Sequence, residues 1–153
     1  MEEDLIQVGD KVFIFRKENI ERDYVRYRVT NSANQTVELV ICSFYQDIAT
    51  KRKFWTIQLS VNRKSKGYEF GKITGKTGLE SLLIAKGCLK QFIDYLESGP
   101  TFWNNHLYIW GDDTKRIRAY ERGLKDFGFA LTNETWGKKY KSGKCLLKTI
   151  NRK

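Results

Sequence analysis

The sequence predicts an α+β fold with a mixed, mostly antiparallel sheet and two main helices. The first half of the chain is a series of short apolar or alternating runs, which are typical of β-strands. The second half contains two segments with the three-and-four apolar spacing of core-facing helices, each followed by short apolar strands. Because the chain has 153 residues and nothing divides its apolar pattern, we expect a single domain over residues 1–153.

The first half is predicted to form an antiparallel meander. Residues 24–30 alternate between apolar and polar side chains, which is the period of a half-buried strand. Residues 37–44 are strongly apolar and rich in β-branched side chains, and the polar cluster at 31–35 indicates a turn before them. The predicted strands cover residues 11–15, 24–30, 37–44, 54–61 and 68–74. Their short polar connections favour antiparallel pairing.

Two helices are predicted in the second half. The first opens at Gly78, and its apolar residues recur at helical spacing until a Ser-Gly-Pro sequence at 98–100 ends it. The second presents an apolar face of Ile117, Tyr120, Leu124 and Phe127. Gly128 is expected to end this helix, and a lysine-rich loop is expected at 136–143. The remaining predicted strands are 106–110, 129–132 and 145–150.

Composition limits the classes of function. The net charge of +10, from 28 Lys and Arg against 18 Asp and Glu, favours nucleic acid, a phosphate-bearing cofactor or an acidic protein as partner, and equally suits a solvated basic surface. Three dispersed cysteines without a CxxC pair, and the single histidine His106, argue against a metal site or a dithiol redox motif. The acidic start is unlike a secretory signal and no apolar run approaches roughly 20 residues, so we expect a cytoplasmic protein without a membrane partner.

A glycine-rich segment, Gly71-Lys-Ile-Thr-Gly-Lys-Thr-Gly78, lies between a predicted strand and the first helix. Free N–H groups and the dipole at a helix start favour an anion, and glycines let the backbone approach a phosphate closely. A P-loop would need glycine at residue 70, where the chain has Phe70, and would follow a strand of a parallel sheet. A nucleotide-hydrolysing P-loop is therefore not favoured.

The order of elements and two local stretches resemble the GNAT family of N-acetyltransferases over residues 54–150. Residues 75–83 look like the acyl-CoA pyrophosphate loop and the helix after it, with Gly78 at the central glycine and Glu80 at a second small position. Residues 116–129 look like the late family helix that ends in Gly-Phe. The resemblance implies an acyl-CoA N-acyltransferase-like fold and an acetyl-CoA cofactor whose pyrophosphate is held by Thr74, Gly75, Lys76, Thr77, Gly78 and Leu79.

The leading function is therefore acetyl-CoA-dependent transfer of an acetyl group to an unidentified amine. An ammonium group must lose a proton before it attacks, so the reaction needs a base. Glu69, in the strand before the glycine-rich segment, or an ordered water is the candidate base. The late-helix tyrosine that often acts as the acid in the family aligns with Leu124 here, and Tyr120, one turn earlier, is the candidate acid. Asp112 and Asp113 are alternative bases, although their place in a turn suits helix capping better.

The alternative function is that of a non-catalytic binding or assembly protein with this fold, of a phage or mobile-element type. Two segments, 51–55 and 136–141, interleave cations with aromatic rings. Cations contact phosphates and rings stack on bases, so such segments suit single-stranded nucleic acid, and their charge also suits an acidic protein. A solvated loop whose ring packs on the core has the same pattern. The candidate contact residues are Lys51, Arg52, Lys53, Lys138, Lys139 and Lys141.

Overall fold

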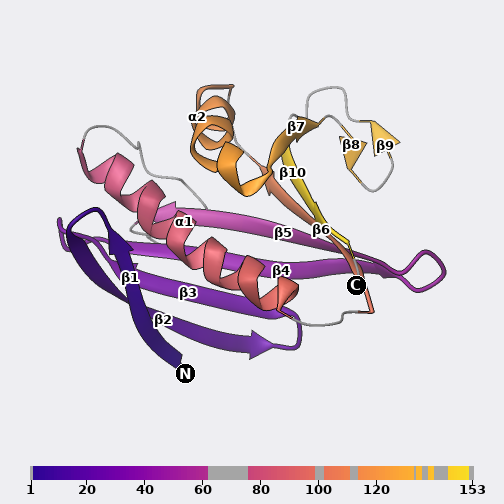
Figure 1. Ribbon diagram of the computed structural model, residues 1–153, viewed down its shortest axis with the longest axis horizontal. Helices are drawn as coiled ribbons and strands as arrows, with labels where there is room; N and C mark the ends of the chain where they lie inside the picture. Colours follow the sequence, from indigo (N-terminus) through magenta and orange to yellow (C-terminus); the bar gives the residue numbers. More distant parts are fainter. Residues whose placement is uncertain are drawn as a thin grey trace. The chain divides into compact units, whose positions relative to one another are not determined.

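The computed structural model describes residues 2–61, 76–98, 102–110, 114–132, 134–135, 138–139 and 145–151 (Figure 1). Their elements are β1 (Glu2–Val8), β2 (Lys11–Glu21), β3 (Tyr24–Thr30), β4 (Thr36–Asp47), β5 (Arg52–Val61), α1 (Lys76–Glu97), β6 (Asn104–Trp110), α2 (Thr114–Leu124), the 3-10 helix η1 (Lys125–Phe127), β7 (Ala130–Thr132), β8 (Glu134–Thr135), β9 (Lys138–Lys139) and β10 (Cys145–Ile150). Eight strands form one sheet in the order β1-β2-β3-β4-β5-β6-β10-β7. The predicted class, α+β with a mostly antiparallel sheet and two helices, is confirmed.

Strands β5 and β6 run parallel to each other, with residues 52–57 paired to residues 104–109. Parallel neighbours need a crossover connection, and α1 lies in the chain between these two strands. β10 then pairs antiparallel with both β6 and β7. From α1 onward the chain therefore has the predicted order of helix, strand, helix and two further sheet strands, with the short β8 and β9 inserted before the last one.

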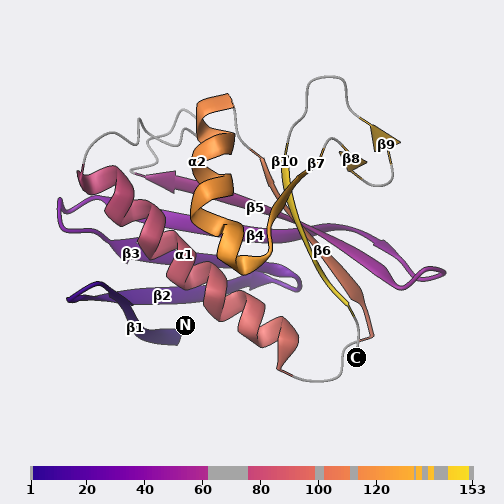
Figure 2. The same ribbon diagram turned by 45° about the horizontal axis from the view of Figure 1, so that its top comes forward.

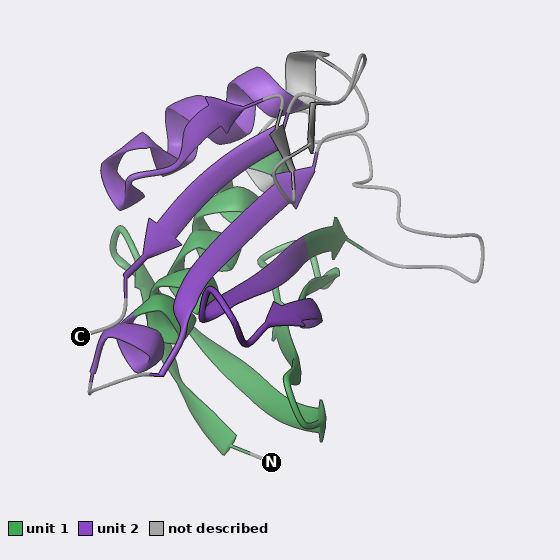
Figure 3. Ribbon diagram, turned by 90° about the vertical axis from the view of Figure 1, so that its right-hand side faces the viewer, with its two compact units in different colours: residues 1–41, 58–93 green, residues 42–57, 94–153 purple. Residues whose placement is uncertain are grey.

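Contacts between residues divide the chain into two compact units, which are coloured separately in Figure 3. Unit 1 comprises residues 1–41 and 58–93, and unit 2 comprises residues 42–57 and 94–153. The boundaries fall inside β4, β5 and α1, so both units contain parts of these elements. The single domain over the whole chain stays a prediction.

In unit 1, α1 runs across one face of the strands β1, β2 and β3 (Figures 1 and 2). β3 alternates as predicted, because Val25, Tyr27 and Val29 are buried while the residues between them are more exposed. The buried Tyr27 hydroxyl donates a hydrogen bond to Oε1 of Gln91 on α1. Burial also raises the pKa of Tyr27, so this hydroxyl remains a donor that ties the sheet to the helix.

β1 is the edge strand that the sequence reasoning missed. It pairs with β2 through a two-residue turn in which Val8 lies opposite Lys11 and Gly9 has a φ of 63°, a conformation that glycine adopts readily. The buried side chain of β1 is Ile6, which lies against Gly87 of α1. A Cβ atom at position 87 would stand 2.5 Å from Cγ2 of Ile6, so this close approach of strand and helix requires glycine.

Unit 2 has its core around β6 and β10. Leu107, Leu146 and Cys145 have no exposed surface, and Phe54 and Tyr108 pack with Cys145 in one buried cluster. The three cysteines of the chain are free thiols. Burial raises the pKa of Cys88 to about 12 and that of Cys145 to about 11, so both remain protonated and serve as small apolar side chains.

Helix α2 of unit 2 matches its prediction closely. It buries Ile117, Tyr120 and Leu124, which are three of the four residues predicted for its inner face. η1 continues it for one turn, and Gly128 follows with a φ of 85° and an N–H that donates to the Lys125 carbonyl at 3.1 Å. The left-handed conformation at Gly128 explains why the helix ends where the sequence places its end.

Several predicted boundaries are wrong. α1 begins at Lys76 rather than at Gly78, which places the glycine inside the first turn. β2 continues beyond residue 15 to Glu21, because its polar half still pairs with β3 and buries Lys17. The region 136–143 is not all loop, since β9 lies in it and pairs locally with β8. The predicted strand 68–74 lies outside the described residues.

Candidate functional site

The glycine-rich segment is described only where it enters α1. Glu69, Thr74 and Gly75 lie outside the described residues, whereas residues 76–79 form the first turn of the helix. Gly78 is buried in this turn. Leu79 beside it is 60% exposed, and no acidic residue lies in the turn. The first backbone N–H groups of a helix have no partner within the helix, so this turn has the polarity that favours an anion.

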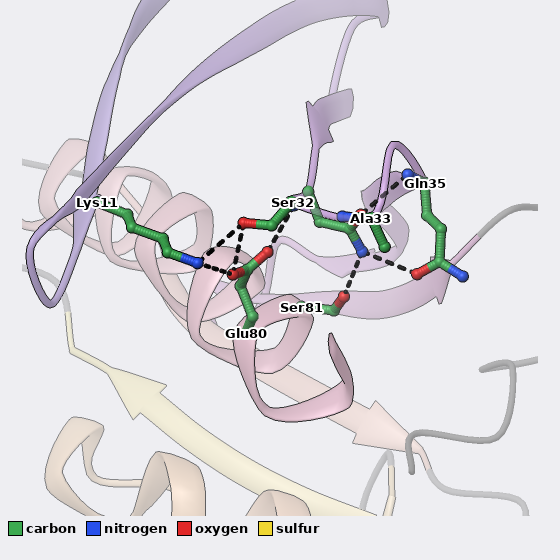
Figure 4. A network of polar contacts seen from close by, with 7 residues as sticks. Lys11, Ser32, Ala33, Gln35, Glu80 and Ser81 are labelled. Carbon is green, nitrogen blue, oxygen red and sulfur yellow. Dashed lines mark hydrogen bonds and ion pairs between the residues drawn. The ribbon is translucent and has the colours of Figure 1, made fainter. Parts of the chain in front are cut away.

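Glu80, one turn into α1, is bound by residues from two β-turns (Figure 4). Its Oε1 accepts a hydrogen bond from the Ser32 backbone N–H at 2.6 Å, and its Oε2 accepts one from the Ser32 hydroxyl at 2.8 Å. Lys11 lies 3.3 Å from the same Oε2. The Ser32 N–H, helped by the Ser32 hydroxyl and by Lys11, holds the pKa of Glu80 below its usual value. Glu80 is therefore charged and compensated at neutral pH.

The turn between β3 and β4 is fixed by Asn31, whose side chain is almost fully buried. Its Oδ1 accepts hydrogen bonds from the N–H groups of Ala33 and Gln35, at 3.0 and 2.9 Å. Its Nδ2 donates to the hydroxyl of Ser81 on α1 at 3.0 Å (Figure 4). The turn was predicted at 31–35, but its attachment to Glu80 and Ser81 was not, because the partners lie about fifty residues away and share no sequence pattern.

Tyr120, the candidate general acid, lies on the inner face of α2 and is 4% exposed. It is buried with Ile117 and Leu124, so it belongs to the core of unit 2. The alternative bases Asp112 and Asp113 lie outside the described residues. The catalytic roles of Glu69 and Tyr120 stay predictions.

The three consecutive cations at the start of β5 each face an aromatic ring. Nζ of Lys51 lies 5.3 Å from the centre of the Phe102 ring, and the Arg52 guanidinium lies 4.8 Å from that of Phe54. Lys53 is buried between rings, with its Nζ 4.7 Å from Trp55 and 5.9 Å from Trp103. These are distances at which a cation is attracted to the face of a ring. Of the other predicted contact residues, Lys138 and Lys139 form β9 and Lys141 lies outside the described residues.

His106 on β6 holds Arg52 in place. Nε of Arg52 donates to Nε2 of His106 at 3.1 Å, and Nδ1 of His106 lies 3.2 Å from the Thr149 hydroxyl. The imidazole is stacked on the Phe54 ring, with 5.0 Å between the ring centres. Burial, assisted by the charge of Arg52, lowers the pKa of His106 to about 4. His106 is therefore neutral at physiological pH and carries its proton on Nδ1, which leaves Nε2 as the acceptor.

The segment before β6 is bound to the same end of β5. The Asn104 N–H donates to the Lys51 carbonyl at 2.7 Å, and the Trp55 indole donates to Oδ1 of Asn105 at 2.9 Å. Phe102 and Trp103 lie edge to face with ring centres 4.9 Å apart. Trp103 is half-buried, whereas Phe102 is 51% exposed. The sequence signal for the exposed ring is its place just before a buried strand rather than in it.

Comparison with known proteins identifies no relative of this chain: no family model, curated protein or solved structure matches it. Among the described residues, no three His, Cys, Asp or Glu side chains are grouped so that they could hold a metal ion. Neither helix of the described part of the chain is long and apolar enough to cross a membrane.

Proposed function

We propose that the protein is an acetyl-CoA-dependent N-acetyltransferase with a GNAT-like fold, acting on an amine that is not yet identified. The observation that carries this proposal is the parallel pair of β5 and β6 within a mostly antiparallel sheet, with α1 as the connection between them. It is followed by α2 and by β7 and β10, which pair antiparallel at the end of the sheet. The succession of helix, strand, helix and two strands belongs to the element order on which the resemblance rests, whereas the strand predicted at 68–74 lies outside the described residues.

The chemistry of the first turn of α1 fits a pyrophosphate. In sheets with parallel strands, ligands bind beyond the carboxyl ends of the strands, where the following helix presents its N–H groups. The turn formed by residues 76–79 follows β5 in the chain, contains the buried Gly78 and has no carboxylate. The next carboxylate, Glu80, is already bound by Ser32 and Lys11. Its charge therefore opposes an anion less than a free carboxylate would.

In this proposal Thr74, Gly75, Lys76, Thr77, Gly78 and Leu79 would hold the pyrophosphate through backbone N–H groups, as the resemblance implies. When bound, acetyl-CoA supplies an activated acyl group as a thioester. Glu69, or a water that it orders, would accept the proton of the acceptor ammonium before the amine attacks the thioester carbonyl. Tyr120 is the candidate acid, whose hydroxyl would donate a proton to the departing thiolate.

The test is binding of acetyl-CoA to the whole chain, measured as a rise in melting temperature. A ligand at 100 times its dissociation constant stabilises a protein by about 2.7 kcal/mol, which corresponds to a rise of about 5–10 °C for a chain of this length. Leu79→Glu places a carboxylate in the first turn at an exposed position, so this variant should fold and lose the rise. Leu83→Glu is the matched control one turn further on, at 37% exposure, and should keep it.

Three outcomes are informative. A rise in the parent chain that Leu79→Glu abolishes and Leu83→Glu preserves supports the site. Transfer of labelled acetyl from acetyl-CoA to amine-bearing macromolecules supports the catalytic role. The absence of any rise at millimolar acetyl-CoA refutes the proposal.

A further inference from the structure

The positive charge of the chain is concentrated in unit 2. Its residues include 15 Lys and Arg against 8 Asp and Glu, whereas unit 1 has 13 against 10. Unit 2 is thus the part of the chain whose field attracts a polyanion.

One surface of unit 2 combines this charge with exposed rings. We call it the hairpin surface, and define it by Tyr45, Lys51, Arg52 and Phe102, at the end where β4 turns into β5. Tyr45 is 52% exposed and Phe102 is 51% exposed. Lys51 and Arg52 are half-buried, and among the described residues neither has an acidic side chain within salt-bridge distance.

Contacts within unit 2 join these four residues as two pairs, which are linked because Lys51 and Arg52 are neighbours in the chain. The Tyr45 ring lies 5.6 Å from the buried Phe54 ring, and the Arg52 guanidinium lies 4.8 Å from that same ring. Lys51, the neighbour of Arg52, reaches the Phe102 ring, and its carbonyl receives the N–H of Asn104. Phe102 therefore lies against a cation, and Tyr45 shares the Phe54 ring with one.

The cation Arg52 of the hairpin surface is held in place by its neighbours. Arg52 is held in one orientation by the Phe54 ring on its face and by His106 at its Nε. Because His106 is neutral, it binds Arg52 without adding a second positive charge. Lys53 differs from its two neighbours, since it is buried between Trp55 and Trp103 and serves packing.

We propose that the hairpin surface binds single-stranded nucleic acid, with Lys51 and Arg52 contacting phosphates and Tyr45 and Phe102 stacking on bases. The occupant follows from the combination of groups: the phosphates of a single strand contact cations, and its flat bases stack on exposed rings. An acidic protein that also covers the rings is the alternative occupant, and displacement by polyglutamate is the result that would indicate it. This inference does not depend on acetyl-CoA binding.

The test measures binding of fluorescent oligo-dT and oligo-U to the whole chain by anisotropy at low and rising salt. Tyr45→Leu and Phe102→Leu keep apolar side chains but remove the rings, and each should weaken binding by about 5- to 100-fold. Tyr45→Trp retains a ring and should retain binding. Ile48→Ala is the matched control, because Ile48 is 72% exposed on the same hairpin and has no ring.

The charges are tested through the salt dependence. Each of Lys51→Gln and Arg52→Gln should reduce the slope of log affinity against log salt by about 0.7 if its side chain neutralises one phosphate. Preference for oligo-U or for oligo-dT would show whether RNA or DNA is the occupant, and either result supports the proposal. Circular dichroism and melting temperature establish that each variant is folded.

Two results would overturn the proposal. One is the failure of the parent chain to bind either oligonucleotide at about 50 mM salt, where phosphate contacts are strong. The other is binding that is unchanged in Tyr45→Leu and Phe102→Leu and is displaced equally well by polyglutamate, which would make it a matter of charge alone. Loss of acetyl-CoA binding in Leu79→Glu with oligonucleotide binding intact would separate the two sites.

Discussion

Acidification from about pH 7 to about pH 5 should destabilise the protein through His106, and this can be followed cleanly because the chain has one histidine. In the folded protein its pKa is lowered from 6.5 to about 4, mainly by burial and further by Arg52. The unfolded chain takes up a proton near the ordinary value of 6.5, whereas the folded chain does not. Between these two values the unfolded state binds more protons, so stability falls as the pH falls.

The size of the effect follows from the two pKa values. If the pKa of His106 is lowered from 6.5 to about 4, the part of the effect reached by about pH 5 is a loss of about 2 kcal/mol of unfolding free energy. We expect about 1–2 kcal/mol, because solvent near the partly exposed Arg52 screens the interaction. The loss begins as the pH passes below 6.5 and levels off below about 4, where both states are protonated.

Two measurements check this prediction. The two imidazole C–H resonances of the one histidine should titrate in proton NMR with a midpoint near 4 in the folded chain, and urea unfolding at several pH values should give the stability curve. His106→Gln should remove the decline between about pH 7 and about pH 5, before the carboxylates titrate. Arg52→Gln should raise the midpoint only part of the way, since burial is the larger cause. A midpoint near 6.5 in the parent chain would refute the reasoning.

Gly87→Ala should destabilise the protein by about 1–3 kcal/mol despite the better helix propensity of alanine, because its methyl group would meet Ile6; urea unfolding should show the loss disappearing in an Ile6→Ala background. Glu80→Gln should cost about 1–3 kcal/mol at neutral pH. A carboxyl group whose pKa is lowered by folding stabilises the folded state above its ordinary pKa of 4.5, and this contribution is lost as the pH falls through the pKa of the folded state. The unfolding free energies of parent and variant should therefore converge in acid, and a pH-independent difference between them would contradict this. With a thiol reagent at mildly alkaline pH, Cys42 should react first in the folded chain, since the buried thiol of Cys88 has a pKa of about 12.

The sequence predicted those elements whose cause is local. β3 follows from strict alternation, and the end of the second helix follows from Gly128, where only glycine adopts the left-handed conformation without cost. β1 was missed because its outer face carries acidic and apolar side chains together, and only Ile6 in it is buried. The polar half of β2 was missed because it is held by pairing with β3, and such pairing cannot be recognised from the sequence of one strand alone.

The candidate sites were predicted less completely. The cations 51–53 were recognised as a basic cluster among rings, but their different roles depend on which ring each one meets. Lys53 meets rings from β5 and from the segment before β6, and is buried as a result. The role of His106 as a neutral acceptor for Arg52 depends on the parallel register of β5 and β6, which sequence spacing does not reveal.

Glu80 shows how a residue that opposes a proposed site can still belong with it. Because its pKa is lowered, Glu80 stays ionised at neutral pH, and its charge must be balanced by its neighbours. The balance comes from Ser32, in the turn after β3, and from Lys11, where the turn between β1 and β2 enters β2. The helix start that we propose for a pyrophosphate is thereby fixed to those turns, and Ser32→Ala should affect it differently from Glu80→Gln. Ser32→Ala removes the hydroxyl and keeps the backbone N–H, which leaves the carboxylate charged and less compensated. It should therefore weaken acetyl-CoA binding as well as folding, whereas loss of the charge should weaken folding alone.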